Sequence, residues 1–179
     1  DNEPAIRISG QTWGALISRE EYDAFELTLE YRWGSAIYPP LGFRDSGVMY
    51  WSVGAPGAVN AGGGALADPP GSGGFMISVE SQIAGNDVGT TYALGPISFR
   101  TVRHTPQPEL PIGQWNELRI VAGADRSEHR LNGRTVSEQA ELVLTLPGEA
   151  PRALTRGKLQ MQSEGAEIFF RRLKIRRLP

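Results

Sequence analysis

The stretch GQWNELRIVAGADRSEHRLNGRTVS, residues 113–137, decides the fold class of this 179-residue chain. With one shift of phase, its apolar residues recur at the two-residue period of a strand that buries one face, at Trp115, Leu118, Ile120 and Ala122. Residues 128–131 then lead into Asn132-Gly133, the strongest short signal for a β-hairpin, and residues 134–137 form the expected return strand. The stretch therefore predicts antiparallel β-structure.

The same alternation recurs earlier in the chain, and helical periodicity is nearly absent. Residues 25–33 place an apolar side chain at every second position, at Phe25, Leu27, Leu29, Tyr31 and Trp33. About a dozen short strands separated by Gly and Pro turns are typical of a sandwich or barrel. The sequence thus predicts an all-β fold, a two-sheet antiparallel jelly-roll sandwich, with residues 1–179 forming one domain.

The last strand contains two conflicting phases. Ile168 and Phe170 share one phase, whereas Leu173 and Ile175 share the other. One face cannot bury both pairs without an extra residue, so we predict a β-bulge near Arg171-Arg172, with burial of both faces as the alternative.

Two long connections interrupt the strands. Residues 54–74 are rich in Gly and Ala and predict a mobile rim loop between two strands, because loops of this length are either functional or disordered. Residues 105–113 contain three prolines and are expected to cross between the sheets.

Composition excludes several classes of protein. A net charge of −2 and a pI near 5.8 argue against nucleic acid as a partner. The chain has no cysteine, so neither a disulfide framework nor a thiolate metal site can form. No apolar run approaches the roughly 20 residues of a membrane span. The chain begins at Asp1 without a signal peptide and is expected to be a mature or trimmed form.

The first candidate ligand-binding strand carries two neighbouring aromatic residues. Residues 46–51 should form a strand with Tyr50 on one face and Met49 and Trp51 on the other. An aromatic side chain on an exposed concave face stacks on sugar rings, so Trp51 and Tyr50 are candidates for substrate binding. Packing of Trp51 in the core is the alternative.

A second strand, residues 78–83, carries polar side chains on one face. Glu80 and Gln82 share this face, so they can meet a ligand together, and a solvent-facing strand is the alternative. Asp87 follows at the strand exit, where it either caps a turn or reaches the site.

The two histidines and a polar strand complete the candidates. His104 and His129 are the natural general acids or bases near neutral pH, although a lone histidine is most often a surface residue. Gln160 and Gln162 share one strand face, with Glu164 in the next turn, and their amides and carboxylate suit sugar hydroxyls. Neither a hydrolase triad nor a Gly-rich phosphate loop is present.

Taken in order, a set of short motifs resembles the bacterial 3-keto-disaccharide hydrolase family from about Phe25 to Leu178. These motifs are Glu30-Tyr31-Arg32-Trp33, Asp45-Ser46-Gly47-Val48, Glu80-Ser81-Gln82-Ile83, Gly113-Gln114-Trp115-Asn116, Leu131-Asn132-Gly133, Met161-Gln162-Ser163-Glu164-Gly165 and Phe170-Arg171-Arg172-Leu173. The resemblance implies a concanavalin-A-like sandwich. It also implies cleavage of glycosides that carry a ketone at sugar carbon 3, by removal of the carbon-2 proton, elimination and hydration.

The resemblance suggests roles for the candidates. Glu80 or His104 would act as the base, and Gln82, Gln162 and Arg171 would orient the sugar or stabilise the enolate. The other expected substrate-binding residues are Trp51, Tyr50, Glu164 and His129. A divalent cation, calcium or another, bound by Glu80 and Asp87 is a further expectation. One departure from the family pattern stands out: the turn Asp87-Val88-Gly89-Thr90 lacks the second acid.

Two other functions stay open. A non-catalytic carbohydrate-binding module would bind a saccharide through an exposed aromatic platform without turnover, and a structural or adhesive domain would do neither. By analogy with the family, the chain is expected to be secreted or periplasmic. The sequence leaves the oligomeric state open.

Overall fold

The computed structural model describes residues 3–60, 64–85, 87–105 and 108–179. These residues form thirteen strands and no helix. The strands are β1 (Ile6–Ile8), β2 (Gly14–Tyr22), β3 (Phe25–Ile37), β4 (Ser46–Val53), β5 (Ile77–Ile83), β6 (Thr91–Leu94), β7 (Ile97–His104), β8 (Asn116–Gly123), β9 (Arg126–Leu131), β10 (Arg134–Leu144), β11 (Arg152–Ala153), β12 (Gly157–Ser163) and β13 (Ala166–Arg177).

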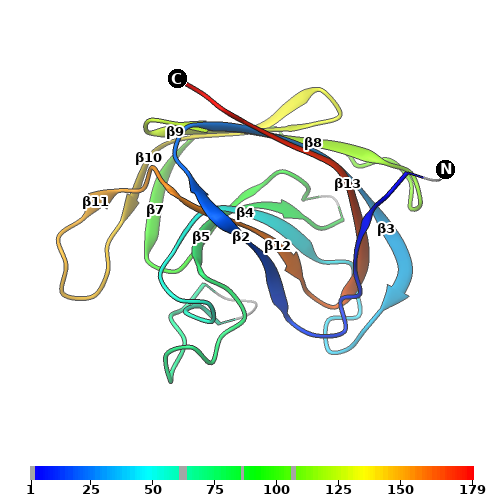
Figure 1. Ribbon diagram of the computed structural model, residues 1–179, viewed down its shortest axis with the longest axis horizontal. Coiled ribbons are helices and arrows are strands. Elements are labelled where there is room, and N and C mark those ends of the chain that lie inside the picture. The colour runs from blue at the N-terminus through cyan, green and yellow to red at the C-terminus, as the bar shows by residue number, and fades with distance from the viewer. Residues whose placement is uncertain (1–2, 61–63, 86, 106–107) are drawn as a thin grey trace.

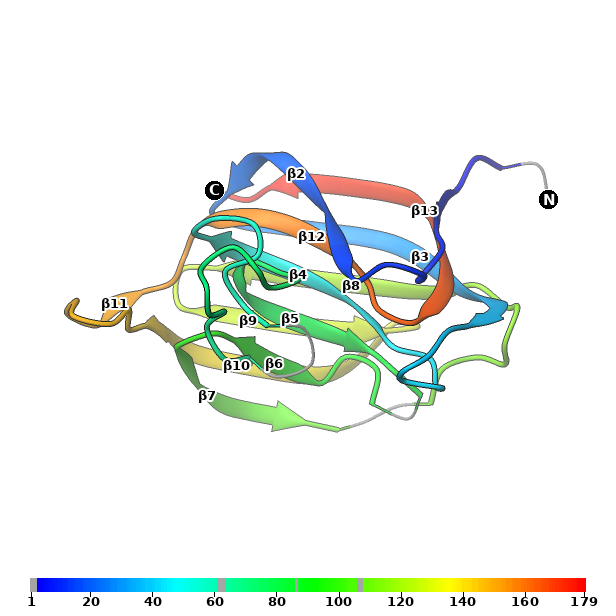
Figure 2. The same cartoon turned by 90° about the horizontal axis from the view of Figure 1, so that it is seen from below.

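Two antiparallel sheets stack to form the predicted jelly-roll sandwich. The eight-stranded sheet has the order β1-β13-β3-β8-β9-β10-β11, and β7 also pairs with β10. The five-stranded sheet has the order β2-β12-β4-β5-β6. Figure 1 shows the larger sheet as an arch above the smaller one. Figure 2 shows that the strands of both sheets run along nearly the same axis. The all-β prediction is confirmed.

Strand alternation places the core between the two sheets. In β3, every second residue from Phe25 to Trp33 is buried, and the residues between them are only partly buried. These side chains join apolar residues of both sheets in one continuous hydrophobic cluster. The alternation predicted for residues 25–33 is therefore confirmed. It identifies the face of the larger sheet that packs against the core.

Two local predictions about the backbone are also confirmed. β9 and β10 pair as a hairpin whose turn residues Asn132 and Gly133 have φ of 49° and 79°, the left-handed region that Asn-Gly turns favour. In β13, the pairing with β3 shifts register between Arg171 and Lys174, and Arg172 has a φ of 53°. This bulge reverses which face of the sheet the following side chains point to. Leu173 therefore lines a hollow together with Leu27 and Leu29.

The prediction for residues 105–113 is wrong. β7 pairs with β10, and β8 lies in that same eight-stranded sheet, so the connection spans one sheet and does not cross to the other. Prolines mark an irregular connection, but pairing partners distant in sequence decide which sheet it joins.

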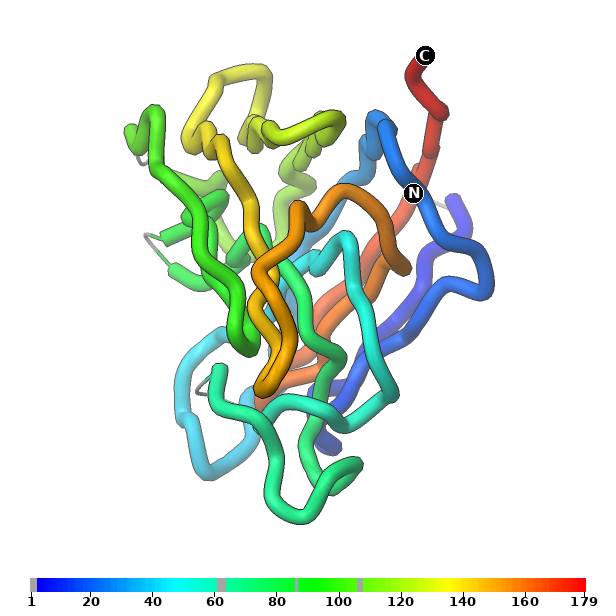
Figure 3. The backbone as a smooth tube through the Cα atoms, turned by 90° about the vertical axis from the view of Figure 1, so that its left-hand side faces the viewer, coloured from blue at the N-terminus to red at the C-terminus, as the bar shows by residue number. Residues whose placement is uncertain are grey.

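The rim loop connects β4 to β5 as predicted, and residues 61–63 of it lie outside the described residues. Its described parts, residues 54–60 and 64–74, lie on the face of the smaller sheet away from the larger one (Figures 1 and 3). Val59 bridges to Leu66 and Phe75, and Val59 and Phe75 are buried. The smaller sheet is therefore covered on both faces, and nearly all residues of β4 and β5 are buried. Within the described residues, no helix is long and apolar enough to span a membrane.

Candidate functional site

Strand register builds a polar surface on the outer face of the smaller sheet, the face that the rim loop covers. Glu80 on β5 pairs with Met49 on β4 and with Tyr92 on β6, and Gly47 pairs with Gln82. Residues paired in this way point to the same side of an antiparallel sheet. Side chains from β5, β6 and β12, together with Asp45 just before β4, thus converge above one patch of the sheet.

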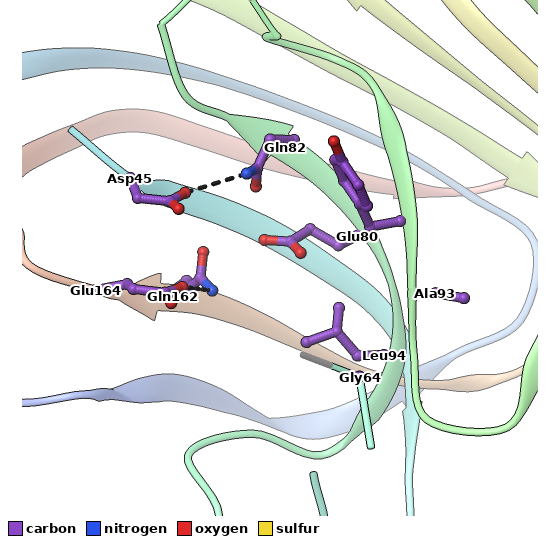
Figure 4. Close-up of a pocket in the computed structure, with 9 residues that line it drawn as sticks. Asp45, Gly64, Glu80, Gln82, Ala93, Leu94, Gln162 and Glu164 are labelled. Atoms are coloured by element: carbon purple, nitrogen blue, oxygen red, sulfur yellow. Dashed lines mark hydrogen bonds between the residues drawn. The ribbon is translucent and has the colours of Figure 1, made fainter. Parts of the chain in front are cut away.

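This patch is the floor of a pocket of about 370 Å³. Its lining residues are Asp45, Gly64, Glu80, Gln82, Tyr92, Ala93, Leu94, Gln162 and Glu164. Figure 4 shows the carboxyl group of Glu80 reaching between the Asp45–Gln82 pair and the Gln162–Glu164 pair. The rim loop contributes Gly64, whose backbone oxygen accepts a hydrogen bond from the Gly95 N–H at 2.8 Å. The loop therefore forms one wall of the pocket.

Gly47 makes room for the central carboxyl group. A Cβ at this position would lie 1.9 Å from Glu80 Oε1, which no real pair of atoms tolerates. Because Gly47 has no side chain, the Glu80 side chain lies flat across β4 toward Asp45 and Glu164. The Asp-Ser-Gly motif of the sequence thus has a steric role in this structure.

Three carboxyl groups meet in the pocket, and their pKa values are all raised. Desolvation is the main cause for each group. It raises the pKa of Asp45 to about 6, and together with the charge of Asp45 it raises that of Glu164 to about 7. Glu80 is buried, and its pKa lies well above the ordinary range because of desolvation and the charges of Asp45 and Glu164. Carboxyl groups with perturbed pKa values in a pocket are typical of acid–base chemistry.

Hydrogen bonds divide the three carboxyl groups into two kinds. Asp45 Oδ1 accepts a hydrogen bond from Gln82 Nε2 at 3.1 Å, and Glu164 Oε2 accepts one from Gln162 Nε2. Glu80 Oε1 and Gln162 Oε1 are buried without a hydrogen-bond partner. Buried polar atoms are normally satisfied, and exceptions of this kind are typical of functional sites.

A chain of hydrogen bonds runs from the pocket to His104. The Tyr92 hydroxyl donates to Asp87 Oδ2 at 2.7 Å, and Thr90 Oγ1 donates to Asp87 Oδ1 at 2.6 Å. His104 Nε2 lies 2.8 Å from Thr90 Oγ1 on the exposed side of this chain. Asp87 and His104 are therefore not among the residues that line the pocket, and the expected direct roles for them as cation ligand and base are not supported.

Three other expected substrate-binding residues are buried inside the sandwich. Tyr50 and Trp51 are fully buried, and Trp51 Nε1 donates to the Asp23 carbonyl at 2.8 Å. His129 is also fully buried, with Nε2 3.0 Å from the Tyr50 hydroxyl and Nδ1 2.8 Å from the Gly89 carbonyl. Burial lowers the pKa of His129 to about 4, which keeps the ring neutral. These residues stabilise the core, and the prediction that they contact a sugar is wrong.

Arg171 lies on the far side of the molecule. It pairs with Glu30 at 2.7 Å and with Glu3 at 3.3 Å, and its guanidinium lies 3.9 Å from the centre of the Trp115 ring. Phe170 before it is in the core, so Arg171 points to the outer face of the larger sheet. The prediction that Arg171 orients the sugar is therefore also wrong.

No group of three or more His, Asp or Glu side chains is arranged to hold a metal ion among residues 3–60, 64–85, 87–105 and 108–179. The pocket offers the oxygen donors that hard cations prefer, but they do not converge on one point.

The structure brings four of the predicted residues together, Glu80, Gln82, Gln162 and Glu164, and adds two that sequence reasoning missed. Asp45 was noted only as part of a motif, and Tyr92 was not noted. The signal for Tyr92 is its pairing with Glu80 across β5 and β6, which becomes visible only once the register is known.

Comparison with known proteins supports a carbohydrate-related assignment. Two solved structures from Parabacteroides distasonis, each a provisionally assigned glycosyl hydrolase, are similar to the chain. One is 17% identical with a TM-score of 0.60, covering 98% of this chain and 81% of that chain. The other is 20% identical with a TM-score of 0.58, covering 93% and 84%.

A carbohydrate-binding module, CBM66 from Bacillus subtilis, has the same fold. It is 9% identical with a TM-score of 0.56, covering 97% of this chain and 95% of that chain. At these identities the solved structures establish the fold alone. Comparison with curated proteins finds no significant match. The family model described as 3-keto-alpha-glucoside-1,2-lyase-like domain matches residues 4–176, so the chain belongs to this carbohydrate-related family.

Proposed function

We propose that the pocket binds a glycoside with a ketone at sugar carbon 3 and cleaves its glycosidic bond by elimination, followed by addition of water. The observation that carries this proposal is the meeting of Asp45, Glu80 and Glu164 in one pocket with raised pKa values. Membership in a 1,2-lyase-like family supports the same reaction class.

The ketone makes elimination feasible with ordinary side chains. It acidifies the proton on carbon 2, because the electron pair left behind is delocalised onto the ketone oxygen as an enolate. As the enolate collapses, a double bond forms between carbons 1 and 2 and the bond from carbon 1 to the leaving oxygen breaks. The leaving oxygen takes up a proton, so the products are an alcohol and an enone. The reaction needs one base and one proton donor.

The charges of the pocket favour Glu164 as the base. Its pKa of about 7 suits proton transfer near neutral pH, and the Gln162 amide that donates to it favours the ionised form. Glu80, for which the sequence predicted the role of base, is the proton donor in this proposal. Desolvation raises its pKa well above the ordinary range, and it has no donor to stabilise its carboxylate.

The same pair serves the hydration step with its roles reversed. After elimination, Glu164 carries the proton from carbon 2 and Glu80 is ionised. Glu80 then takes a proton from water as the hydroxide adds to carbon 1, and Glu164 returns its proton to carbon 2. Both carboxyl groups regain their starting protonation, and the product is the free 3-keto sugar. Gln82 and Gln162 orient the sugar hydroxyls.

We further propose how a cation would be held and where the protein acts. A divalent cation in the pocket would use Asp45, Glu80 or Glu164, because Asp87 lies outside its lining. The three groups do not converge on one point, so the proposed reaction takes no step through a metal. Dialysis of the purified protein against a chelator, with the rate measured before and after, tests this part. A secreted or periplasmic location stays a proposal by analogy with the family.

The test uses matched 3-keto-glucosides with a methyl or a 4-nitrophenyl leaving group, together with their unoxidised parents. We expect turnover of the keto forms alone. Glu164→Gln should slow both keto substrates by about 10²–10⁴, the range for loss of a general base. Glu80→Gln should slow the methyl glycoside by a similar factor but the nitrophenyl glycoside by less than about tenfold, because nitrophenolate leaves without a proton.

The control is Glu149→Gln, which removes an exposed carboxyl group in the connection between β10 and β11, outside the residues that line the pocket. It should leave every rate unchanged. An unchanged rate in Glu164→Gln removes that residue as the base, and equal losses for both leaving groups in Glu80→Gln remove the proton-donor role. No turnover of any keto substrate, together with measurable glycan binding, would favour the non-catalytic binding module.

A further inference from the structure

A second hollow of about 560 Å³ lies at the end of the sandwich, where three connections meet. We call it the end hollow. Its lining residues are Ile37, Gly42, Phe43, Arg44, Ala84, Gly85, Glu109 and Ile112. They come from the last residue of β3, the connection between β3 and β4, the turn after β5 and the segment before β8, which Figure 2 shows at one end of the molecule.

The accessible part of the end hollow is apolar. Phe43 is 52% exposed, Ile112 is 62% exposed and Ile37 is 37% exposed. Large apolar side chains gathered at a hollow mark a binding surface more often than isolated ones do. Two polar groups there have protein partners: Glu109 accepts from Trp33 Nε1 at 2.9 Å, and Arg44 Nη2 donates to the Gly34 carbonyl at 3.3 Å. Arg44 Nε is buried and has no hydrogen-bond partner.

The end hollow adjoins the carboxyl pocket through the backbone. Arg44 lines the hollow and Asp45, the next residue, lines the pocket, so their Cα atoms are about 3.8 Å apart. Gln82 in the pocket is likewise two residues from Ala84 in the hollow, about 7 Å at most. The two hollows therefore share the backbone of residues 44–45 and 82–84 as their common border.

We propose that the end hollow is the subsite for an aromatic aglycone, so that the preferred substrates are 3-keto-glycosides of phenols. This inference rests on the proposed function and specifies its leaving group. A second sugar would need several hydrogen-bonding partners for its hydroxyls, whereas this surface offers Phe43, Ile37 and Ile112. A phenol presents an apolar ring that packs against these side chains, and the ring of Phe43 favours offset or edge contacts.

The experiment compares the methyl 3-keto-glucoside with its 4-nitrophenyl and 4-methylumbelliferyl counterparts in the full chain. The variants are Phe43→Ala and Ile112→Ser, both at exposed positions where the fold tolerates the change. We expect KM for the two aromatic substrates to rise about tenfold, the size of effect that loss of one apolar contact surface produces. KM for the methyl glycoside should stay within about twofold of the parent value.

The matched control is Val102→Ser, which removes an apolar side chain that is 46% exposed on β7 and lines neither hollow. It should change no KM. Unchanged KM for the aromatic substrates in both variants, or equal rises for all three substrates, overturns the subsite. So does a concentration-dependent dimer that Phe43→Ala dissociates, because the surface would then join two copies of the chain.

Failure of the proposed function gives a different pattern. In that case no 3-keto-glucoside, methyl or aromatic, is turned over. The subsite is then tested by fluorescence titration with 4-methylumbelliferone itself. Saturable binding that Phe43→Ala weakens about tenfold supports an aromatic subsite without catalysis. Absence of binding to the parent protein overturns it.

Discussion

Replacing Glu164 by glutamine should stabilise the protein at alkaline pH, and this effect measures how strongly the pocket disfavours negative charge. Desolvation and the charge of Asp45 raise the pKa of Glu164 from 4.5 to about 7. Each unit of pKa corresponds to about 1.4 kcal/mol, so an ionised Glu164 costs the folded state roughly 3 kcal/mol. Glu164 lines the pocket, so solvent there screens its charge and this figure is an upper bound.

The sign follows from comparing the folded and unfolded states. Below about pH 4 the carboxyl group is protonated in both states, and it causes no loss of stability. As the pH rises from about 4.5 to 7, the unfolded chain releases this proton while the folded chain retains it, so the free energy of unfolding falls. Above about pH 7 both states are ionised and the loss is complete. A glutamine does not titrate and still accepts the hydrogen bond from Gln162.

The assay is urea denaturation of the parent and of Glu164→Gln at pH values from 4 to 8, with Glu149→Gln as the exposed control. We expect equal stabilities at pH 4 and a variant more stable by roughly 2–3 kcal/mol at pH 8, allowing for the coupling with Asp45. A difference that does not change with pH would refute the reasoning. A parent more stable than the variant at pH 8 would show that a bound cation or donor stabilises the carboxylate.

Two further predictions test the steric and core roles assigned above. Gly47→Ala should reduce turnover of 3-keto-glycosides by at least about 10² and destabilise the fold by about 1–3 kcal/mol, because its Cβ would lie 1.9 Å from Glu80 Oε1. Urea denaturation of the double variant with Glu80→Ala should recover that stability, and additive losses would contradict the contact. Tyr50→Phe should lower the free energy of unfolding by about 1–3 kcal/mol by leaving His129 Nε2 without its partner, with KM unchanged. A raised KM in folded Tyr50→Phe would restore the ligand-binding role.

The parts of the fold that were predictable depend on neighbouring residues. Alternation over residues 25–33, the Asn132-Gly133 turn and the bulge at Arg172 each follow from side chains or backbone angles within one short segment. Their physical causes, one buried face or a turn that needs positive φ, operate at that range. The partner sheet of residues 97–104 is decided by β10 instead, about forty residues away along the chain, and no local pattern specifies it.

The candidate site was predictable only in part for the same reason. Glu80, Gln82 and Gln162 were found because a strand with one polar face predicts its own geometry. Trp51 and Tyr50 were misassigned because alternation assumes a regular strand. Trp51 has a φ of 47°, and the pairing with β5 shifts register between Tyr50 and Val53, so both aromatic side chains lie in the hydrophobic core.

The missing second acid of the turn at residues 87–90 bears on activity less than the family pattern suggests. Thr90 stands at that position, and its hydroxyl donates to Asp87 outside the residues that line the pocket. The three pocket carboxyls come from other segments, namely the residue before β4, the middle of β5 and the turn after β12. An acid at position 90 would not add a fourth group to them. It would place a negative charge beside Asp87, which fixes the hydroxyl of Tyr92, so the threonine is compatible with a working pocket.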